Sequence, residues 1–448
     1  MRAVRKLRLG LCSSLAMLSL AIGCGGAEVK STSAALGGGD DGVRPPAVQA
    51  ITSATFPSPT RAVLRHRGEP TASRPGVELL TVEHHSAPVI FFRWVLPGGR
   101  SVEFSSGSSK RTTRWPEGTI DLTAATLTEG TVRHRGNSFA AAIESLGGQL
   151  SVRVLDDAIV VEGRVLSHQL EPYLALVHEA LTRPEMSSRA TENLRKRHIA
   201  SLTNLERRPR RVAARLVNRL LYGDHDPYGS PGLTLASVRK VKTSHMRAAF
   251  KRAFRIGGST LVAVGDFKSS RLGALLRKTF GRSLDGEPAP VQLRDVATKP
   301  ASGCHVVHIP GAVQTALVHA NLATPRSTQD WPQMVLANQV LGGSASSRLF
   351  SILRERLGLT YGVYSSFDAR LRSGDWSMST SVRTAKTAQA TAAASVEINM
   401  MRSTQVKAAE LQAAKQFIAG QFVLSQASWS TVADRIAALR LYDLPADT

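Results

Sequence analysis

The sequence predicts an α+β fold made of two tandem units of the same design. The chain has 448 residues, which is too long for one compact core. Pairs of strand-like segments followed by amphipathic helices occur twice, first over residues 75–284 and again over residues 301–448. Residues 285–300 between them contain Pro and charged residues, so we expect a linker there.

The first unit begins with alternating apolar residues that predict two strands, VELLTVEHH and PVIFFRWVLPGG. A second strand pair, QLSVRVLDDAIVVEGRVL, follows two short helices, and STLVAVGDF reads as a buried strand near the end of the unit. We expect helices at 120–128, 138–146, 170–181, 187–205, 212–221 and from Thr243 or Ser244 to Phe254.

The second unit repeats this order. Its expected strands are HVVHIPG, QTALVHANLAT, GVYSSFDARL and GDWSMSTSVRT, and its expected helices are 331–341, 347–357, 386–401 and 408–424. By internal comparison, residues 441–448 correspond to Tyr222-Gly223 of the first unit, which then continues with a helix, the GDF strand and another helix. We therefore expect the second unit to be incomplete or to lack its last strand.

The N-terminal segment predicts export and lipid anchoring. Residues 1–23 combine a basic start with an apolar stretch, as in a signal peptide, and Ala-Ile-Gly-Cys at 21–24 resembles a bacterial lipoprotein cleavage box. We expect Cys24 to carry the lipid, with residues 24–74, rich in Gly, Ala, Ser, Thr and Pro, as a flexible tether. The alternative is an ordinary secretory signal cut nearby. The expected location is the bacterial cell envelope, on the outer membrane facing the periplasm.

The formal net charge of +23 raises the question of nucleic-acid binding. The cations are scattered in groups such as LRKRH and ERRPRR, without a nucleic-acid motif or interleaved aromatic residues. We therefore expect no nucleic-acid partner, and we expect anionic lipid or acidic partners instead. Cys304 is the one cysteine left beyond Cys24, so a disulfide within the mature chain is excluded.

Several short motifs recur in an order and spacing typical of one protein family. They are LPGG at 96–99, LTEGT at 127–131, IESLGGQLSV at 143–152, NRLLYGDHDPYGSPG at 218–232, LVAVGDF at 261–267, PGAVQT at 310–315, LGGSASSRLFSILRERLGLTYGVYS at 341–365 and ELQAAK at 410–415. Together they resemble the insulinase, or pitrilysin, family of zinc peptidases. The resemblance implies two homologous units with antiparallel-rich sheets packed by helices, which face each other around a chamber for an extended peptide.

Active members of that family hold zinc with a His-x-x-Glu-His helix and a distant Glu. The resemblance aligns Asp121, Ala124 and Ala125 with the motif and Ser201 with the distant Glu. A catalytic zinc needs three protein ligands and a water, and these residues do not supply them. We therefore expect no catalytic residue and no zinc or other cofactor on this chain, with Asp121 acting only as an acid near a helix N-terminus.

The other histidines do not predict a replacement site. His84 and His85 are adjacent on a strand and point to opposite faces, and His305 and His308 also diverge. His225 lies in a turn-rich loop, while His134 and His178 lack the partner four residues away that a helical zinc pair needs.

The second unit retains two residues that the family uses to hold substrate near the zinc. Arg354 and Tyr361 match that Arg and Tyr in spacing, and a guanidinium and a phenol can hydrogen-bond peptide carbonyls. The alternative is that LRERLGLTY is a packing motif in which Arg354 forms a salt bridge with a neighbour.

The resemblance therefore implies a catalytically silent homologue that pairs with a zinc-bearing subunit of the same family. In such a heterodimer the partner supplies the metal and the base, while Arg354 and Tyr361 hold an extended peptide substrate. Two alternatives remain open: a peptide-binding or scaffold lipoprotein without proteolysis, and an active zinc metalloendopeptidase with relocated ligands.

Overall fold

The computed structural model describes residues 56–68, 70–71, 74–104, 115–224, 226–287, 289 and 302–445. One compact part of the chain, residues 54–301 and 309–448, contains every helix and strand named below, and residues 302–308 fall outside it. The predicted signal peptide, Cys24, most of the predicted tether and His225 lie outside the described residues. Within the described part of the chain, no helix is both long and apolar enough to span a membrane.

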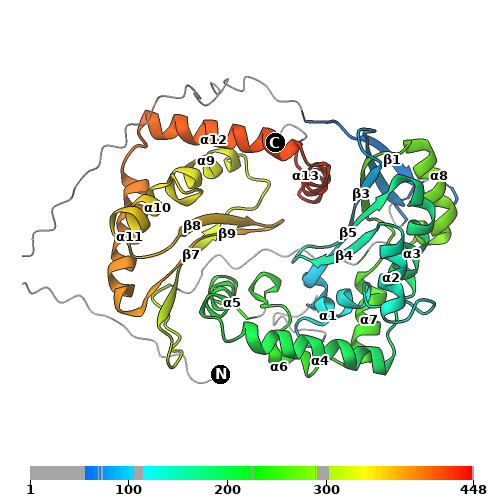
Figure 1. Cartoon of the computed structure of the whole chain (residues 1–448), viewed down its shortest axis with the longest axis horizontal. Helices are drawn as coiled ribbons and strands as arrows, with labels where there is room; N and C mark the ends of the chain where they lie inside the picture. The colour runs from blue at the N-terminus through cyan, green and yellow to red at the C-terminus, as the bar shows by residue number, and fades with distance from the viewer. Residues whose placement is uncertain are drawn as a thin grey trace, which may run out of the picture. The chain divides into compact units, whose positions relative to one another are not determined.

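The first sheet has the strand order β1-β2-β6-β3-β5-β4 in the described residues (Figure 1). Its strands span Thr60–Leu64 (β1), Val77–Glu83 (β2), Val89–Pro97 (β3), Gln149–Val154 (β4), Ala158–Leu166 (β5) and Thr260–Gly265 (β6). Neighbouring strands are antiparallel except β2 and β6, which run parallel. The structure confirms the predicted α+β class, with sheets that are mostly antiparallel.

Successive side chains of the central strands enter two different apolar clusters, because neighbouring residues of a strand point to opposite faces. On one face, Trp94 and Leu261 pack with helices α3 (Leu170–Thr182) and α8 (Ser269–Phe280). On the other face, Val95 and Val262 pack with Ile436 of helix α13 (Trp429–Leu441), the last helix of the described chain. Both faces of the sheet are therefore covered.

A group of helices beside the first sheet positions the segment that resembles the zinc motif. They are α1 (Thr119–Thr126), α2 (Asn137–Ser145), α4 (Ser188–Leu205), α6 (Leu235–Val238) and α7 (Thr243–Ala253). Leu122 of α1 is fully buried against Leu194 and Leu202 of α4 and Met246 of α7. This packing fixes the face of α1 that carries residues 121, 124 and 125.

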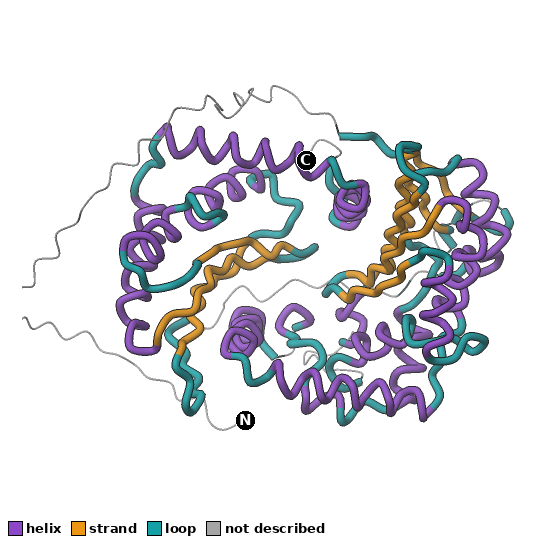
Figure 2. The backbone as a smooth tube through the Cα atoms, in the orientation of Figure 1, coloured by secondary structure: helices purple, strands orange, loops and turns teal. Residues whose placement is uncertain are grey.

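The second sheet has three strands in the described residues, in the order β7-β9-β8 (Figure 2). They are Gln314–Ala323 (β7), Val363–Ala369 (β8) and Gly374–Arg383 (β9), and all pairs are antiparallel. Helices α9 (Trp331–Gly342), α10 (Arg348–Phe350), α11 (Thr387–Ser403) and α12 (Ala408–Gln426) lie in the same part of the chain. Leu349, Leu353 and Ala394 form a core with Met378 of β9.

Each sheet is packed by one helix from the other half of the chain. Helix α5 (Pro209–Tyr222) follows the first sheet's helices in sequence, yet its Leu221 and Tyr222 pack with Ala320 and Leu322 of β7. Helix α13 follows the second sheet and packs on the first. The internal comparison equates the ends of these two helices, so the exchange is reciprocal.

Two expectations for the second unit differ from the structure. Residues 305–311 do not form a strand. A strand needs a hydrogen-bonded neighbour, and among the described residues no strand is paired with HVVHIPG. The helix expected at 347–357 is a short α-turn followed by a π-helical segment, Ser351–Arg356.

Candidate functional site

The N-terminus of helix α1 is held by a buried carboxylate. Glu103 accepts hydrogen bonds from the backbone N–H groups of Gly118 at 3.1 Å and Ile120 at 2.6 Å. Gly118 has a φ of 77°, and a side-chain carbon there would lie 2.4 Å from the Leu233 Cα, so glycine is required. Burial and the charge of Asp121 raise the pKa of Glu103 to about 8, although the two N–H donors and Arg100 act in the opposite direction.

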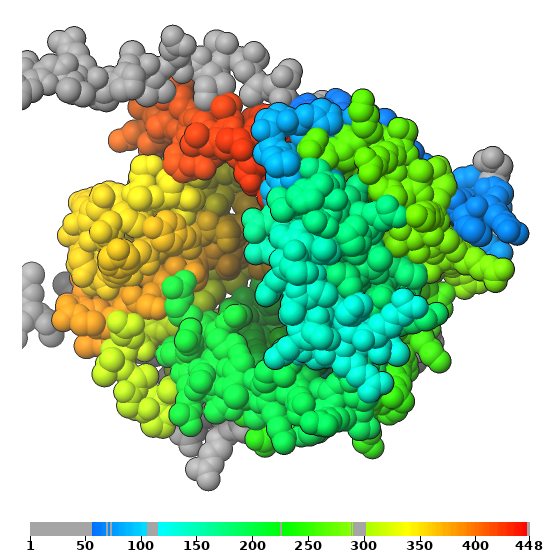
Figure 3. Space-filling model, turned by 45° about the vertical axis from the view of Figure 1, so that its right-hand side comes forward, coloured from blue at the N-terminus to red at the C-terminus, as the bar shows by residue number. Residues whose placement is uncertain are grey.

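The four positions aligned with the zinc ligands and base line one cavity of about 1050 Å³. Asp121, Ala124 and Ala125 reach it from α1, and Ser201 reaches it from α4. Figure 3 shows the surface hollowed between the first-unit residues, coloured cyan and green, and the yellow and orange residues of the second. Their meeting at one cavity supports the alignment of these positions with one ligand set.

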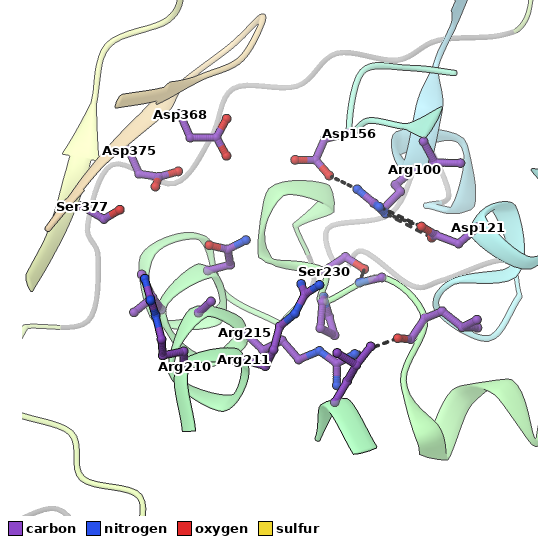
Figure 4. A pocket seen from close by; sticks show the side chains of 18 of the residues that line it. Arg100, Asp121, Asp156, Arg210, Arg211, Arg215, Ser230, Asp368, Asp375 and Ser377 are labelled. Atoms are coloured by element: carbon purple, nitrogen blue, oxygen red, sulfur yellow. Dashed lines mark hydrogen bonds and ion pairs between the residues drawn. The ribbon is translucent and has the colours of Figure 1, made fainter. Parts of the chain in front are cut away.

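Asp121 is engaged by an arginine (Figure 4). Arg100 donates to both carboxylate oxygens of Asp121, with the shortest contact, from Nη2 to Oδ1, at 2.7 Å, and its Nη1 donates to Asp156 at 3.1 Å. Burial lowers the pKa of Arg100, but the two carboxylates outweigh it and raise that pKa above its ordinary value. The guanidinium therefore stays charged beside Asp121. A carboxylate held by a cation, two methyl groups and a hydroxyl do not fit a zinc ion.

The cavity contains one histidine that the sequence reasoning did not single out. His198 lies on α4, three residues before Ser201, and lines the cavity with Asp121. Burial and Arg197 lower its pKa below the ordinary value, although Glu129 and Asp121 act in the opposite direction. Its i, i+3 spacing from Ser201 on one helix was the available signal. Across the described ranges, no three His, Cys, Asp or Glu side chains are grouped so that they could hold a metal ion.

A buried ion network joins the tips of two hairpins at the cavity wall. Arg370, 5% exposed in the β8–β9 turn, donates to Asp156 at 2.7 Å, Asp368 at 2.8 Å and Asp375 at 2.6 Å. Asp156 belongs to the β4–β5 turn of the first sheet and also accepts from Arg100. The sequence did not reveal this network, because Asp156 and Arg370 are 214 residues apart.

Two tyrosines extend the network away from the cavity. The Tyr222 hydroxyl donates to Asp375 at 3.0 Å, and the Tyr228 hydroxyl donates to Asp157 at 2.8 Å. Asp157 also accepts the backbone N–H of Leu371 at 3.0 Å. Burial raises the pKa of both hydroxyls and of the Asp157 carboxyl, so the tyrosines remain protonated donors.

Arg354 and Tyr361 lie together but not among the residues that line the cavity. The Arg354 guanidinium carbon is 4.9 Å from the ring centre of Phe350 and 5.3 Å from that of Tyr361. Tyr361 is 91% exposed. The described residues give Arg354 no ion pair; the arginine of this segment that forms one is Arg348, with Glu410 at 2.8 Å. Both side chains are open to a molecule outside the chain.

The remaining candidate histidines are placed apart from the cavity lining. His85 contacts Asp266 at 2.7 Å, and His134 contacts Glu179 at 3.0 Å. His84 packs edge-on against Trp429, and His178 packs edge-on against Phe280. These contacts give the four side chains structural partners. They do not bring any two of them to a common site.

Comparisons with known proteins agree with this architecture. The family model of the peptidase M16 inactive domain matches residues 240–418. The crystal structure of a peptidase M16 inactive domain from Pseudomonas fluorescens superposes with a TM-score of 0.76 and 26% identity, covering 87% of this chain and 89% of that one. A protease from Helicobacter pylori has the same fold, with a TM-score of 0.76 at 15% identity, over 87% of this chain and 91% of its own.

Curated relatives include both peptidases and a non-peptidase. An uncharacterized zinc protease of Mycobacterium bovis is 26% identical over 52% of this chain and 54% of its own length. The non-peptidase homolog YmxG of Helicobacter pylori is 23% identical over 64% of each chain. The chain spans about half the length of the first of these relatives. In its motifs, its fold and these matches, the chain is similar to the M16 peptidases, the insulinase family, and its residues 240–418 match the model of the inactive domain.

Proposed function

We propose that this protein is a catalytically silent M16 homologue that binds extended peptides and pairs with a zinc-bearing M16 subunit in the bacterial envelope. The observation that carries the proposal is the cavity at which residues 121, 124, 125 and 201 meet without a ligand set for zinc. The name of the non-peptidase homolog from Helicobacter pylori supports a silent role. The partner would supply the metal and the base.

Peptide binding is supported by a strand edge beside the cavity that no strand of the described residues pairs with. β4 is the last strand in the order of its sheet, and its Val152 and Val154 line the cavity. The outer edge of such a strand presents unpaired N–H and C=O groups, which an extended peptide can bind as an added strand. A bound peptide would run along β4, close to α1.

Arg354 and Tyr361 support pairing with a second subunit. Because they lie outside the lining of this chain's cavity and are exposed, we propose that they hold the backbone of a peptide shared with the partner. Anchoring through a lipidated Cys24 would place this assembly at the outer membrane.

The proposal is tested by recovering the full-length protein from membranes with its bound partners. We expect a zinc-bearing M16 chain to co-purify, peptide cleavage by the pair, and neither cleavage nor stoichiometric zinc with the purified chain alone. The double variant Arg354→Ala/Tyr361→Phe should slow cleavage by the pair. Arg356→Ala, an exposed arginine two residues away, is the control and should leave it unchanged.

Three outcomes would count against the proposal. One tightly held zinc per purified chain would show an intact metal site. Cleavage by the chain without a partner would show catalysis. Recovery of non-peptidase partners alone, without cleavage in any fraction, would favour the scaffold alternative. A complementary variant, Asp121→His/Ala124→Glu/Ala125→His/Ser201→Glu, should gain zinc if these positions share one site, because it places three ligands and a base there.

A further inference from the structure

We propose that the cavity selects peptides that carry acidic side chains, because helix α5 forms an arginine subsite opposite the aspartate wall. This wall consists of Asp121, Asp156, Asp368 and Asp375. The proposal rests on the peptide binding proposed above and adds the class of peptide that is bound. The subsite consists of Arg210, Arg211, Arg215 and Asn218, all on α5 and all in the cavity lining. Figure 4 shows the three labelled arginines below Asp156, Asp368 and Asp375.

The charged groups of the aspartate wall already have partners. Asp121 and Asp156 accept from Arg100, and Asp156, Asp368 and Asp375 accept from Arg370. The guanidiniums of Arg100 and Arg370 are therefore directed to the protein's own carboxylates. A ligand carboxylate would be repelled near this wall, so it would be drawn to the other side of the cavity.

The arginines of α5 differ in their partners. Arg215 donates to Glu206 at 2.9 Å and to the Leu233 carbonyl oxygen at 2.9 Å, so its position is fixed. Arg210 and Arg211 are exposed, and the described residues provide neither guanidinium with an ion pair or a hydrogen bond. Two guanidiniums with free donors therefore face the space that a peptide on β4 would occupy.

The placement of these arginines is unfavourable to the helix itself. Arg210 and Arg211 lie in the first turn of α5, where the helix dipole disfavours cations, and Arg211 is four residues from Arg215, where like charges repel. A ligand carboxylate would relieve both effects, and guanidiniums bind carboxylates with paired hydrogen bonds. The arrangement therefore fits an Asp or Glu side chain of a bound peptide.

The test compares dye-labelled peptides of one length and one strand-forming sequence that differ only in two central residues, Glu, Gln or Lys. Fluorescence anisotropy gives the dissociation constants for the full chain, for Arg210→Gln/Arg211→Gln and for Arg207→Gln/Arg208→Gln. The second pair is the matched control, because it removes the same charge from adjacent exposed residues that do not line the cavity.

We expect the unmodified protein to bind the Glu peptide about fivefold or more tightly than the Gln peptide, and the Lys peptide most weakly. Arg210→Gln/Arg211→Gln should remove this preference by weakening the binding of the Glu peptide, while the control keeps the preference. Circular dichroism checks that each variant is folded.

Equal binding of the Glu and Gln peptides would overturn the inference but leave the proposed peptide binding intact. An equal loss of preference in both double variants would also overturn it, because the effect would then come from general charge. A single-stranded oligonucleotide that binds as tightly as the Glu peptide, with the same sensitivity to Arg210→Gln/Arg211→Gln, would contradict selection of peptides. If none of the three peptides binds, the proposed function fails together with the inference.

Discussion

At the scale of single residues, the segment that the resemblance aligns with the zinc motif is held by interactions that the alignment did not indicate. Asp121 is the first of them, and Arg100 holds it in a paired hydrogen bond. Glu103, fully buried behind the helix, accepts the N–H groups at the N-terminus of α1. The surroundings of the positions aligned with the zinc ligands therefore form an ion-paired structural element. The clearest electrostatic consequence is the raised pKa of Glu103.

Glu103 predicts a pH-dependent stability. Burial raises its folded-state pKa from 4.5 to about 8. Because the folded protein binds the proton more tightly, the stabilisation is complete below the unfolded pKa and is lost as the pH rises towards about 8. Between pH 5 and pH 8, this group should lower the free energy of unfolding by on the order of 4 kcal/mol.

The variant Glu103→Gln should flatten that dependence, since an amide does not titrate in this range. Urea denaturation at several pH values between 5 and 8 measures the slope. Glu144→Gln, at an exposed residue without an ion pair in the described structure, is the control and should keep the slope of the unmodified protein. A slope in Glu103→Gln equal to that of the unmodified protein would show that Glu103 does not cause it.

At the scale of elements, the reciprocal exchange of α5 and α13 ties each sheet to the other half of the chain. Sequence patterns predicted a helix at 212–221, within α5, but none at 429–441, where α13 lies. Helix α13 covers the face of the first sheet formed by Leu80, Val82, Val95, Val262 and Val264. Asp434 of α13 also contacts that sheet, because it accepts a hydrogen bond from Arg93 of β3 at 2.6 Å. The folding of the first sheet should therefore depend on a helix more than 160 residues further along the chain.

Ile436 tests this dependence, because it is 2% exposed in the cluster between α13 and the first sheet. We expect Ile436→Ala to lower the free energy of unfolding by about 2–4 kcal/mol through lost burial and the cavity it leaves. Chemical denaturation provides the measurement. Leu424→Ala on α12, at a side chain 68% exposed, should change stability by less than about 0.5 kcal/mol. Similar effects of both substitutions would indicate that α13 is not packed as described.

At the scale of the whole molecule, the hairpin tips of the two sheets meet at Arg370. Its guanidinium serves carboxylates from both sheets, Asp156 from the first and Asp368 and Asp375 from the second. Tyr222 of α5 adds a hydroxyl to the same cluster. This buried cation specifies how the two hairpins meet, since another arrangement would leave the carboxylates of Asp156 and Asp375, the two less exposed partners, without it.

Removal of this cation should be costly. In Arg370→Met, Asp375 and Asp156 lose a buried ionic partner, and we expect a loss of about 3–5 kcal/mol in the free energy of unfolding. Arg356→Met, at an exposed arginine of the same half, should have little effect. Thermal and urea denaturation measure both variants. A loss below about 1 kcal/mol in Arg370→Met would mean that the network does not hold the hairpins together.

Local patterns were sufficient for most elements but not for the strand HVVHIPG. Its alternation is that of a strand, yet a strand also needs a hydrogen-bonded neighbour, and the described residues pair no strand with it. Sequence patterns also did not indicate that His198 lies at the cavity, because its place there depends on how α4 packs against α1. Arg354 and Tyr361 were recognised as a pair from their spacing, but their position outside the cavity lining required the structure.

The sequence by itself determined the α+β class, the repeated order of elements and the side chains at the four positions aligned with the zinc motif, because these follow from residue identity and short-range periodicity. The tertiary structure decided that those positions share one cavity, that Arg100 engages Asp121, and that α5 and α13 change places. It also decided the union of the hairpins at Arg370. These features depend on contacts between residues far apart in the chain, and local patterns carry no information about which distant groups meet.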